Sequence, residues 1–155
     1  MEKYVIDTSS LIFMTQMHPH EIFKTLWETI FKLFESGILF SIENVYWELK
    51  DSQKYWANFR KYFRAPTQEE LQFTQQIIQD NRFKMFTQYG LKNDSAGLWA
   101  DPHLISCALA NPNVSVITEE NSNRHKERKI SYVCDELNIN YMNFIEFLKL
   151  QNIVF

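Results

Sequence analysis

The sequence predicts an α/β fold, a three-layer α/β/α sandwich with a mostly parallel central sheet. Short apolar runs typical of buried strands alternate along the chain with longer segments in which apolar residues recur at helical spacing. Strands that alternate with helices form parallel sheets covered on both faces, because each crossover helix packs back onto the sheet. The 155 residues suit one domain, spanning 1–155, with a single core.

The strands are predicted at four short apolar runs, which are 4–6, 38–40, 114–117 and 139–141. The spacing of apolar residues predicts helices over 21–36, from about 43 to 49, from about 55 to 66, from 67 to just before 90, and over 101–110, 131–137 and 143–150. Three local signals mark helix ends: Gly37 as a C-cap, Thr67 to Glu70 as a capping box, and Asp101-Pro102 as a capping acid before a first-turn proline.

Charge and cysteine usage bound the class of protein. The net charge of −3 gives no global attraction to nucleic acid, although basic residues gather at 50–64 and 124–129, where the usual interpretation is a solvated face. No apolar stretch approaches the ~20 residues of a membrane span and no signal-peptide pattern opens the chain, so we expect a cytoplasmic protein with no membrane partner. Cys107 and Cys134 lie in apolar helical patterns without metal-site spacing, which predicts core thiols.

Acidic residues stand at comparable positions in several elements. Asp7 ends the first strand, at the carboxyl edge where α/β folds place ligands. Glu48 and Asp101 lie on predicted helices that begin near the same edge, and Glu120 comes soon after Thr118, which ends a later strand. Because parallel strands end at one edge, we expect these carboxyls to converge, where they repel one another unless divalent cations neutralise them. Oxygen ligands favour Mg²⁺ or Mn²⁺.

Simpler interpretations of the acids remain open. Asp7 also suits a cap on the next helix, Glu48 a solvated helix face, and Asp101 an N-cap before Pro102. Either Glu119 or Glu120 serves as the fourth acid, and the number of metal ions, one or two, is open. Two interpretations are open for Trp99 (base stacking or core) and for Asn93 and Asp94 (outer ligand or turn), while His103 and His125 are candidates for contact with substrate phosphate.

At these residues the chain resembles the PIN domain family, metal-dependent ribonucleases that include the VapC-type toxins. The resemblance covers nearly the whole chain, and it is closest to a PIN-like branch described mainly as a domain of unknown function. It is carried by the order and spacing of four motifs: Val5-Ile6-Asp7-Thr8-Ser9, Val45-x-x-Glu48-Leu49, Asp101-Pro102-His103-Leu104-Ile105-Ser106-Cys107-Ala108, and Val116-Ile117-Thr118-Glu119-Glu120.

The resemblance implies a role for each matching residue. Asp7, Glu48 and Asp101 match the family's three best-kept acids, and Glu120 stands where the wider family more usually has Asp. This longer side chain puts a second metal ion in doubt. Three hydroxyl residues would support the acids: Thr8 or Ser9, which would hold the first acid, and Thr118 at the end of the later strand.

We therefore expect a metal-dependent endoribonuclease that hydrolyses RNA phosphodiester bonds, the toxin of a toxin–antitoxin pair. One Mg²⁺ or Mn²⁺ ion on Asp7 and Asp101, with Glu48 bound directly or through water, would activate the attacking water. The candidates for phosphate contact are Lys50, Lys54 and Arg124.

The sequence leaves some alternatives to a toxin open and disfavours another. The open ones are a catalytically weak PIN-like protein-binding module and an RNA-processing nuclease that is not a toxin. A haloacid-dehalogenase-like phosphatase needs an acid two residues after its strand-end Asp, where this chain has Ser9.

Aromatic residues make up 15% of the chain and are concentrated in its first half. We expect them to exceed what one core of this size hides, so that the surplus faces another chain. Helices over 21–36 and 43–64 would provide that surface, and the resemblance adds that PIN domains often form homodimers. RNA, a cognate antitoxin protein and a second copy of the chain are thus the expected partners.

Overall fold

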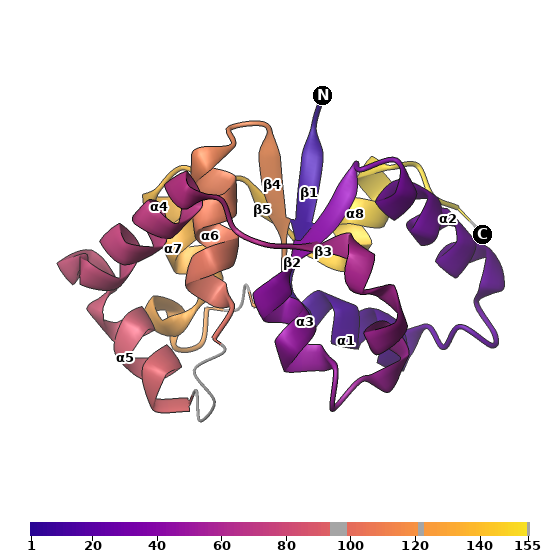
Figure 1. Cartoon of the computed structure of the whole chain (residues 1–155), viewed down its shortest axis with the longest axis horizontal. Coiled ribbons are helices and arrows are strands. Elements are labelled where there is room, and N and C mark those ends of the chain that lie inside the picture. The colour runs from indigo at the N-terminus through magenta and orange to yellow at the C-terminus, as the bar shows by residue number, and fades with distance from the viewer. Residues whose placement is uncertain (94–98, 121–122, 155) are drawn as a thin grey trace.

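The computed structural model describes residues 1–93, 99–120 and 123–154. Within them lies a five-stranded sheet in the order β3-β2-β1-β4-β5, and every neighbouring pair is parallel (Figure 1). Its strands are β1 (Lys3–Ile6), β2 (Leu39–Ile42), β3 (Phe63–Arg64), β4 (Val114–Ile117) and β5 (Tyr141–Met142). The parallel sheet confirms the predicted α/β class.

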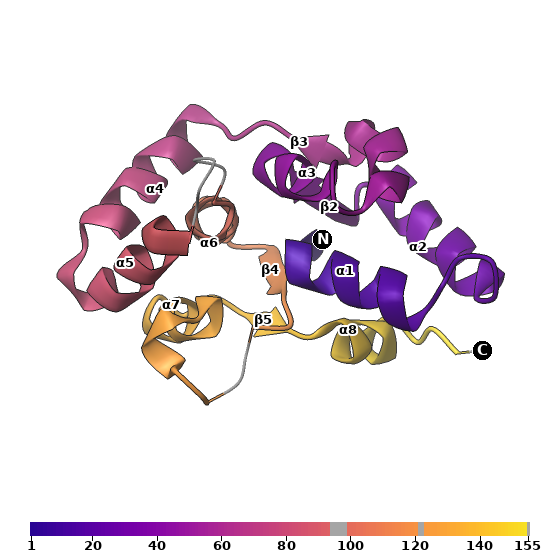
Figure 2. The same cartoon turned by 90° about the horizontal axis from the view of Figure 1, so that it is seen from below.

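Helices cover both faces of the sheet. They are α1 (Thr8–Met17), α2 (Lys24–Glu35), α3 (Glu43–Leu49), α4 (Gln68–Gln79), α5 (Lys84–Asn93), α6 (Asp101–Ala110), α7 (Ile130–Glu136) and α8 (Phe144–Leu150), with 3₁₀ segments η1 (Lys54–Tyr62), η2 (Asn81–Phe83) and η3 (Lys126–Arg128). Helices α4, α6 and α7 lie on one side of the strands, and α1, α2 and α8 lie on the other (Figures 1 and 2). No helix in the described part of the chain is long and apolar enough to cross a membrane.

The strand order reverses direction between β1 and β4. The chain first adds β2 and β3 on one side of β1, then crosses through α4 to α6 and adds β4 and β5 on the other side. At such a switch point the connections leave in opposite directions, which opens a crevice at the carboxyl ends of the two strands. Figure 2 shows α1, α3 and α6 grouped around this end of the sheet. Asp7 and Thr118 directly follow the two strands that flank it.

The two central strands lie inside the core. Val5, Ile6, Val116 and Ile117 are fully buried, as expected for parallel strands that are covered on both faces and therefore carry continuous apolar runs. Cys107 and Cys134 are buried free thiols, which confirms their predicted place in the core.

The helix predicted from about 55 to 66 is wrong. This segment forms the 3₁₀ segment η1, kinked at Phe59, and then strand β3. Phe63 pairs in register with Ser41 of β2, and the Arg64 guanidinium binds the buried Glu70 carboxylate at 2.8 Å. Long-range pairing and a buried ion pair thus override the local helical spacing.

The single helix predicted from 67 to just before 90 is also wrong. The first helix ends before Asp80, whose carboxylate accepts a 2.9 Å hydrogen bond from the Arg82 amide and so caps the start of η2. Gly90 does not end a helix; it lies within α5, where a Cβ atom would overlap the Trp99 ring. The predicted ends at Gly37, with φ of 78°, and at Thr67, which accepts from the Glu70 amide, are confirmed.

The expected surplus of aromatic residues is largely absorbed by the fold. Trp27, Phe34 and Trp56 are buried, and Trp56 packs 5.4 Å from Trp27 and 6.1 Å from Phe34 between ring centroids. These three rings therefore belong to the core and do not face another chain. The homodimer itself stays a prediction.

Candidate active site

Asp7 stands at the end of β1 and at the N-cap position of α1. Its side chain is 2% exposed and makes no capping hydrogen bond to that helix. Oδ2 instead accepts hydrogen bonds from Ser9 Oγ at 2.7 Å and from Thr118 Oγ1 at 2.9 Å. Burial raises the pKa of Asp7, and these two hydroxyl donors oppose the rise. A cap alone does not explain this carboxylate, because its contacts reach across the switch point.

Glu48 is fixed at both carboxylate oxygens. Thr8 Oγ1 donates to Oε2 and the Ala100 amide donates to Oε1, each at 2.8 Å. Burial raises the pKa of Glu48 to about 7, with a further contribution from the charge of Asp7 and an opposing one from the Thr8 hydroxyl. The solvated-face interpretation is therefore wrong. Of the two hydroxyl residues predicted to hold the first acid, Ser9 binds Asp7, whereas Thr8 binds Glu48.

Asp101 is the first residue of α6, and Ala100 occupies the N-cap position that the sequence assigns to the acid. The Ala100 amide donates to the Glu48 carboxylate, so the start of α6 contacts a second acid. Burial raises the pKa of Asp101 well above its usual range, and the charges of Asp7, Glu120 and Glu48 add to the rise. The carboxyl thus stands in a field dominated by other acids.

Glu119 and Glu120 play different roles. The Glu119 carboxylate accepts from Ser10 Oγ at 2.7 Å and from the Phe144 amide at 3.0 Å, so it joins α1 to the start of α8. Burial raises the pKa of Glu120 to about 6, Asp7 raises it further, and Lys129 lowers it. Glu120 is therefore the fourth member of the acidic cluster, and Glu119 has a structural role.

The four acids Asp7, Glu48, Asp101 and Glu120 form one electrostatic cluster, because the charges of its members shift the pKa values of the others. In the described residues, however, no three His, Cys, Asp or Glu side chains stand in position to hold one metal ion. An all-oxygen set of carboxyls with raised pKa values suits a hard divalent cation. Binding by three of them would require their side chains to move closer together.

Two cations, Lys129 and Lys50, have defined surroundings: the first acts on an acid of the cluster and the second contacts a ring. Lys129 lowers the pKa of Glu120 and is a functional candidate that sequence reasoning did not single out; its only signal was its place in the 124–129 basic run. The Lys50 ammonium lies 5.2 Å from the centre of the Trp47 ring. The two other predicted phosphate contacts, Lys54 and Arg124, are exposed.

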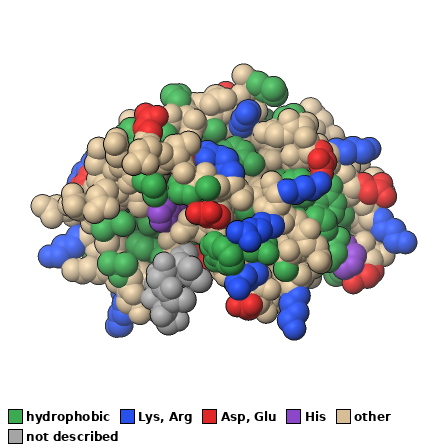
Figure 3. All heavy atoms as spheres, viewed as in Figure 1, with side chains coloured by type: hydrophobic (Ala, Val, Ile, Leu, Met, Phe, Trp, Pro, Cys, Tyr) green, Lys and Arg blue, Asp and Glu red, His purple; other side chains and the backbone are tan. Residues whose placement is uncertain are grey.

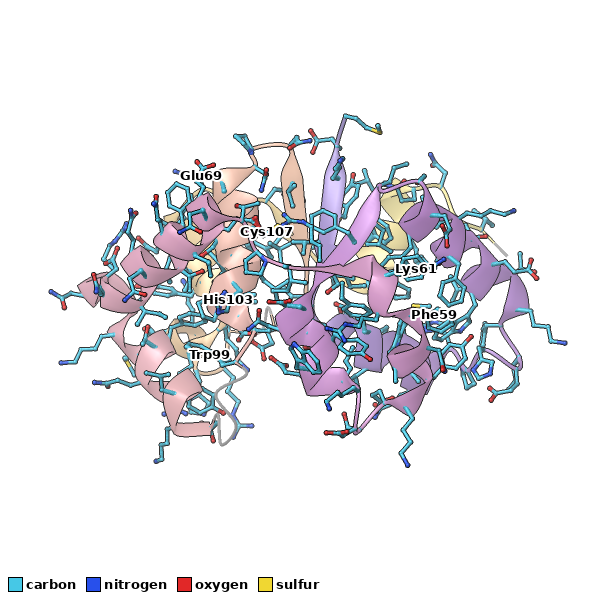
Figure 4. The ribbon with its side chains drawn as sticks, in the orientation of Figure 1. Phe59, Lys61, Glu69, Trp99, His103 and Cys107 are labelled. Carbon is cyan, nitrogen blue, oxygen red and sulfur yellow. The ribbon has the colours of Figure 1, made fainter. Side chains whose placement is uncertain are left out.

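The remaining candidates divide between the core and the surface. Trp99 packs 4.9 Å from Phe86 between ring centroids, which supports its core interpretation. His103, on α6 across the molecule from the η1 residues Phe59 and Lys61 (Figure 4), is half-buried, and burial lowers its pKa. Asn93 donates a hydrogen bond to the Tyr89 carbonyl, and His125 is exposed. Asp94, the other candidate outer ligand, lies outside the described residues.

Fold and site together define a parallel α/β protein with an acidic cluster at the switch point of its sheet. The chain belongs to the family described as a domain of unknown function, DUF4411, which matches residues 4–155. No curated protein and no solved structure matches the chain.

Proposed function

We propose that this protein is a metal-dependent endoribonuclease of the PIN domain type, acting as the toxin of a toxin–antitoxin pair. One observation carries the proposal: hydrogen bonds tie Asp7 to Thr118, and tie Glu48 to Thr8 and to the Ala100 amide next to Asp101, so that acids from separate segments lie at the switch point, where burial and their charges raise their pKa values. Burial and mutual repulsion make their charged forms costly, and a divalent cation is the partner that offsets both.

Asp7, Asp101 and Glu120 would hold the ion, with Glu48 bound directly or through water. When bound, a divalent cation lowers the pKa of a water molecule and stabilises the charge that develops on a phosphodiester. The chain's own groups orient the carboxylates: Ser9 and Thr118 donate to Asp7, and Thr8 donates to Glu48. Such supporting hydrogen bonds around ligands typically change metal affinity 10–100-fold.

Phosphate contacts would come from outside the acidic cluster. Lys50, Lys54 and Arg124 are the candidates, and a cation close to the leaving oxygen would stabilise its developing charge. Attack by water on phosphorus with cleavage of the P–O3′ bond needs no covalent enzyme intermediate and would leave a 5′-phosphate and, on the departing 3′ oxygen once it takes up a proton, a 3′-hydroxyl.

The test is cleavage of a labelled single-stranded RNA by the purified chain. We expect cleavage with Mg²⁺ or Mn²⁺, none with excess EDTA, and recovery when the metal is restored. Cleavage that continues unchanged in EDTA would reject the metal-dependent mechanism. Expression of the wild-type chain, but not of Asp7→Asn, should arrest growth if the nuclease is a toxin; normal growth with active enzyme would favour RNA processing.

A second candidate is a PIN-like protein-binding module with a weak metal site. It is favoured by one observation, that no three metal-ligating side chains among the described residues are in place for an ion. Calorimetry with Mn²⁺ separates the two functions, because the nuclease requires an ion that wild type binds and Asp7→Asn does not.

A further inference from the structure

The outer face of α3 carries two aromatic rings and a cation on one stripe. Glu43, Tyr46, Trp47 and Lys50 follow the spacing i, i+3, i+4 and i+7, which places them on the same side of a helix. The opposite side carries Val45 and Leu49, which are fully buried. The stripe therefore faces away from the core.

Trp47 is held by cations rather than by the core. It is half-buried and, unlike Tyr46, does not pack against the hydrophobic core of the described residues. The Arg60 guanidinium lies 4.9 Å and the Lys50 ammonium 5.2 Å from the centre of its ring. Tyr46 meets the same ring edge-on at 5.3 Å. A large aromatic ring outside the core, with cations beside it, offers a surface on which the ring of a ligand can stack.

A pocket of about 410 Å³ adjoins this stripe. It is lined by Glu43, Tyr46, Arg60, Lys61 and Phe63. A hollow of this size falls in the range that accommodates small ligands, which is about 300–1,000 Å³. Figure 3 shows hydrophobic side chains together with Lys and Arg side chains over α3 in the middle of this face.

The cations beside Trp47 are available to a ligand. Lys61 is paired with Glu35 at 2.7 Å, and Arg64 is paired with the buried Glu70. Arg60 and Lys50, by contrast, form no ion pair with any carboxylate in the described part of the chain. Their ring contacts leave their charges free to meet phosphate, and the net charge of −3 makes this attraction local.

The position of the platform connects it to the acidic cluster. Glu48 directly follows Trp47, so their Cα atoms are about 3.8 Å apart. Successive side chains of a helix leave it about 100° apart, so a strand stacked on Trp47 would pass beside the face of α3 that carries Glu48. The carboxylate of Glu43 lines the pocket and repels a phosphate inside it. A base would therefore enter the pocket, while Arg60 and Lys50 would contact the phosphates of the strand.

We propose that Trp47, Tyr46 and Arg60 form a base-stacking site for single-stranded RNA beside the acidic cluster. Aromatic faces with nearby cations are the chemistry by which proteins bind unpaired strands, whereas a duplex keeps its base faces stacked internally. The inference rests on the proposed function for the identity of the polymer, and it adds the class of strand and the residues that hold it.

The experiment measures binding without cleavage. A fluorescein-labelled 12-nucleotide RNA is titrated with Asp7→Asn protein in EDTA at fixed salt, and anisotropy reports the affinity. In this background Trp47→Ala and Arg60→Ala should each weaken binding about tenfold, in line with ~1–3 kcal/mol per stacked base. Trp47→Phe should retain most of the affinity, and Lys149→Ala, an exposed cation on α8, should retain all of it. Circular dichroism checks that each variant is folded.

The outcomes separate this proposal from the nuclease assignment. If RNA binding depends on Trp47 but wild type never cleaves RNA, the stacking site stands and the nuclease proposal fails. If Trp47→Ala binds single-stranded RNA as tightly as its parent, or if the parent binds duplex of the same sequence equally well, the stacking site is overturned. Loss of a copurifying protein partner in Trp47→Ala with unchanged RNA affinity would also overturn it, in favour of a protein interface.

Discussion

Thr118 Oγ1 donates a 2.9 Å hydrogen bond to Oδ2 of Asp7, across the point where the strand order reverses. This bond links the ends of β1 and β4, the two strands that flank the switch point. Ser9 Oγ donates to the same oxygen and lies 3.3 Å from Thr118 Oγ1. Two hydroxyl side chains thereby fix the orientation of the most buried acid in the cluster.

Removing the Thr118 hydroxyl should weaken metal binding. Thr118→Val keeps the shape of the side chain but withdraws a donor that opposes the rise in the pKa of Asp7. We expect a drop of about tenfold or more in Mn²⁺ affinity at pH 7, measured by calorimetry. Thr118→Ser is the matched control and should bind nearly as well as wild type. Equal affinity of the valine variant would show that Thr118 does not support a metal ligand.

Loss of a single acid should abolish most activity. Asp7→Asn and Asp101→Asn preserve shape and remove charge, so each should lower the RNA cleavage rate at least ~10²-fold, about 3 kcal/mol. Glu119→Gln is the control, because that carboxylate holds α1 and α8 together and lies outside the proposed ligand set. Near wild-type rates for Asp7→Asn, in protein free of contaminating nuclease, would overturn the site assignment.

The free energy of unfolding of the metal-free protein should fall as the pH rises. The pKa of Glu48 is raised to about 7 and that of Glu120 to about 6 from their ordinary value of 4.5, so the folded state binds protons more tightly than the unfolded chain. The stabilisation is complete below pH 4.5 and is lost as the pH rises to about 7. For Glu48 alone this is on the order of 3 kcal/mol.

Urea unfolding in EDTA at several pH values measures this trend. Glu48→Gln should flatten the dependence between pH 4.5 and 7, and Mn²⁺ should reverse it by stabilising the ionised acids. A metal-free protein that gains stability steadily over the same range would contradict the raised pKa values.

The position of the cluster could be predicted because its signals are local. Asp7 follows an uninterrupted apolar run, and parallel topology brings the ends of such runs to one edge. The choice between Ser9 and Thr8 could not be predicted, since it depends on Glu48, 40 residues after Thr8 in the chain. The structural role of Glu119 could not be predicted either, because its partner is the Phe144 amide, 25 residues away.

Strand β3 illustrates the same limit in the fold. Phe63 and Arg64 lie in a stretch with helical spacing, yet their pairing partners are Ser41 and Ile42. A two-residue strand has too little pattern of its own to outweigh the spacing around it. Such elements are set by contacts between distant segments and not by local sequence.

The homodimer remains to be tested, and the structure changes how to test it. Trp56→Asp is a poor probe of association, because Trp56 is fully buried and a charge there would unfold the chain. Ile22 lies in the segment expected to associate and is 74% exposed, so Ile22→Asp can break an interface without touching the core. Light scattering at micromolar concentration should give about twice the 18.6 kDa mass for wild type and about one chain mass for Ile22→Asp. Ile78→Asp on α4, outside that segment and 36% exposed, is the control and should stay dimeric. A wild-type monomer over this concentration range would reject the dimer, and an Ile22→Asp dimer would place the interface elsewhere.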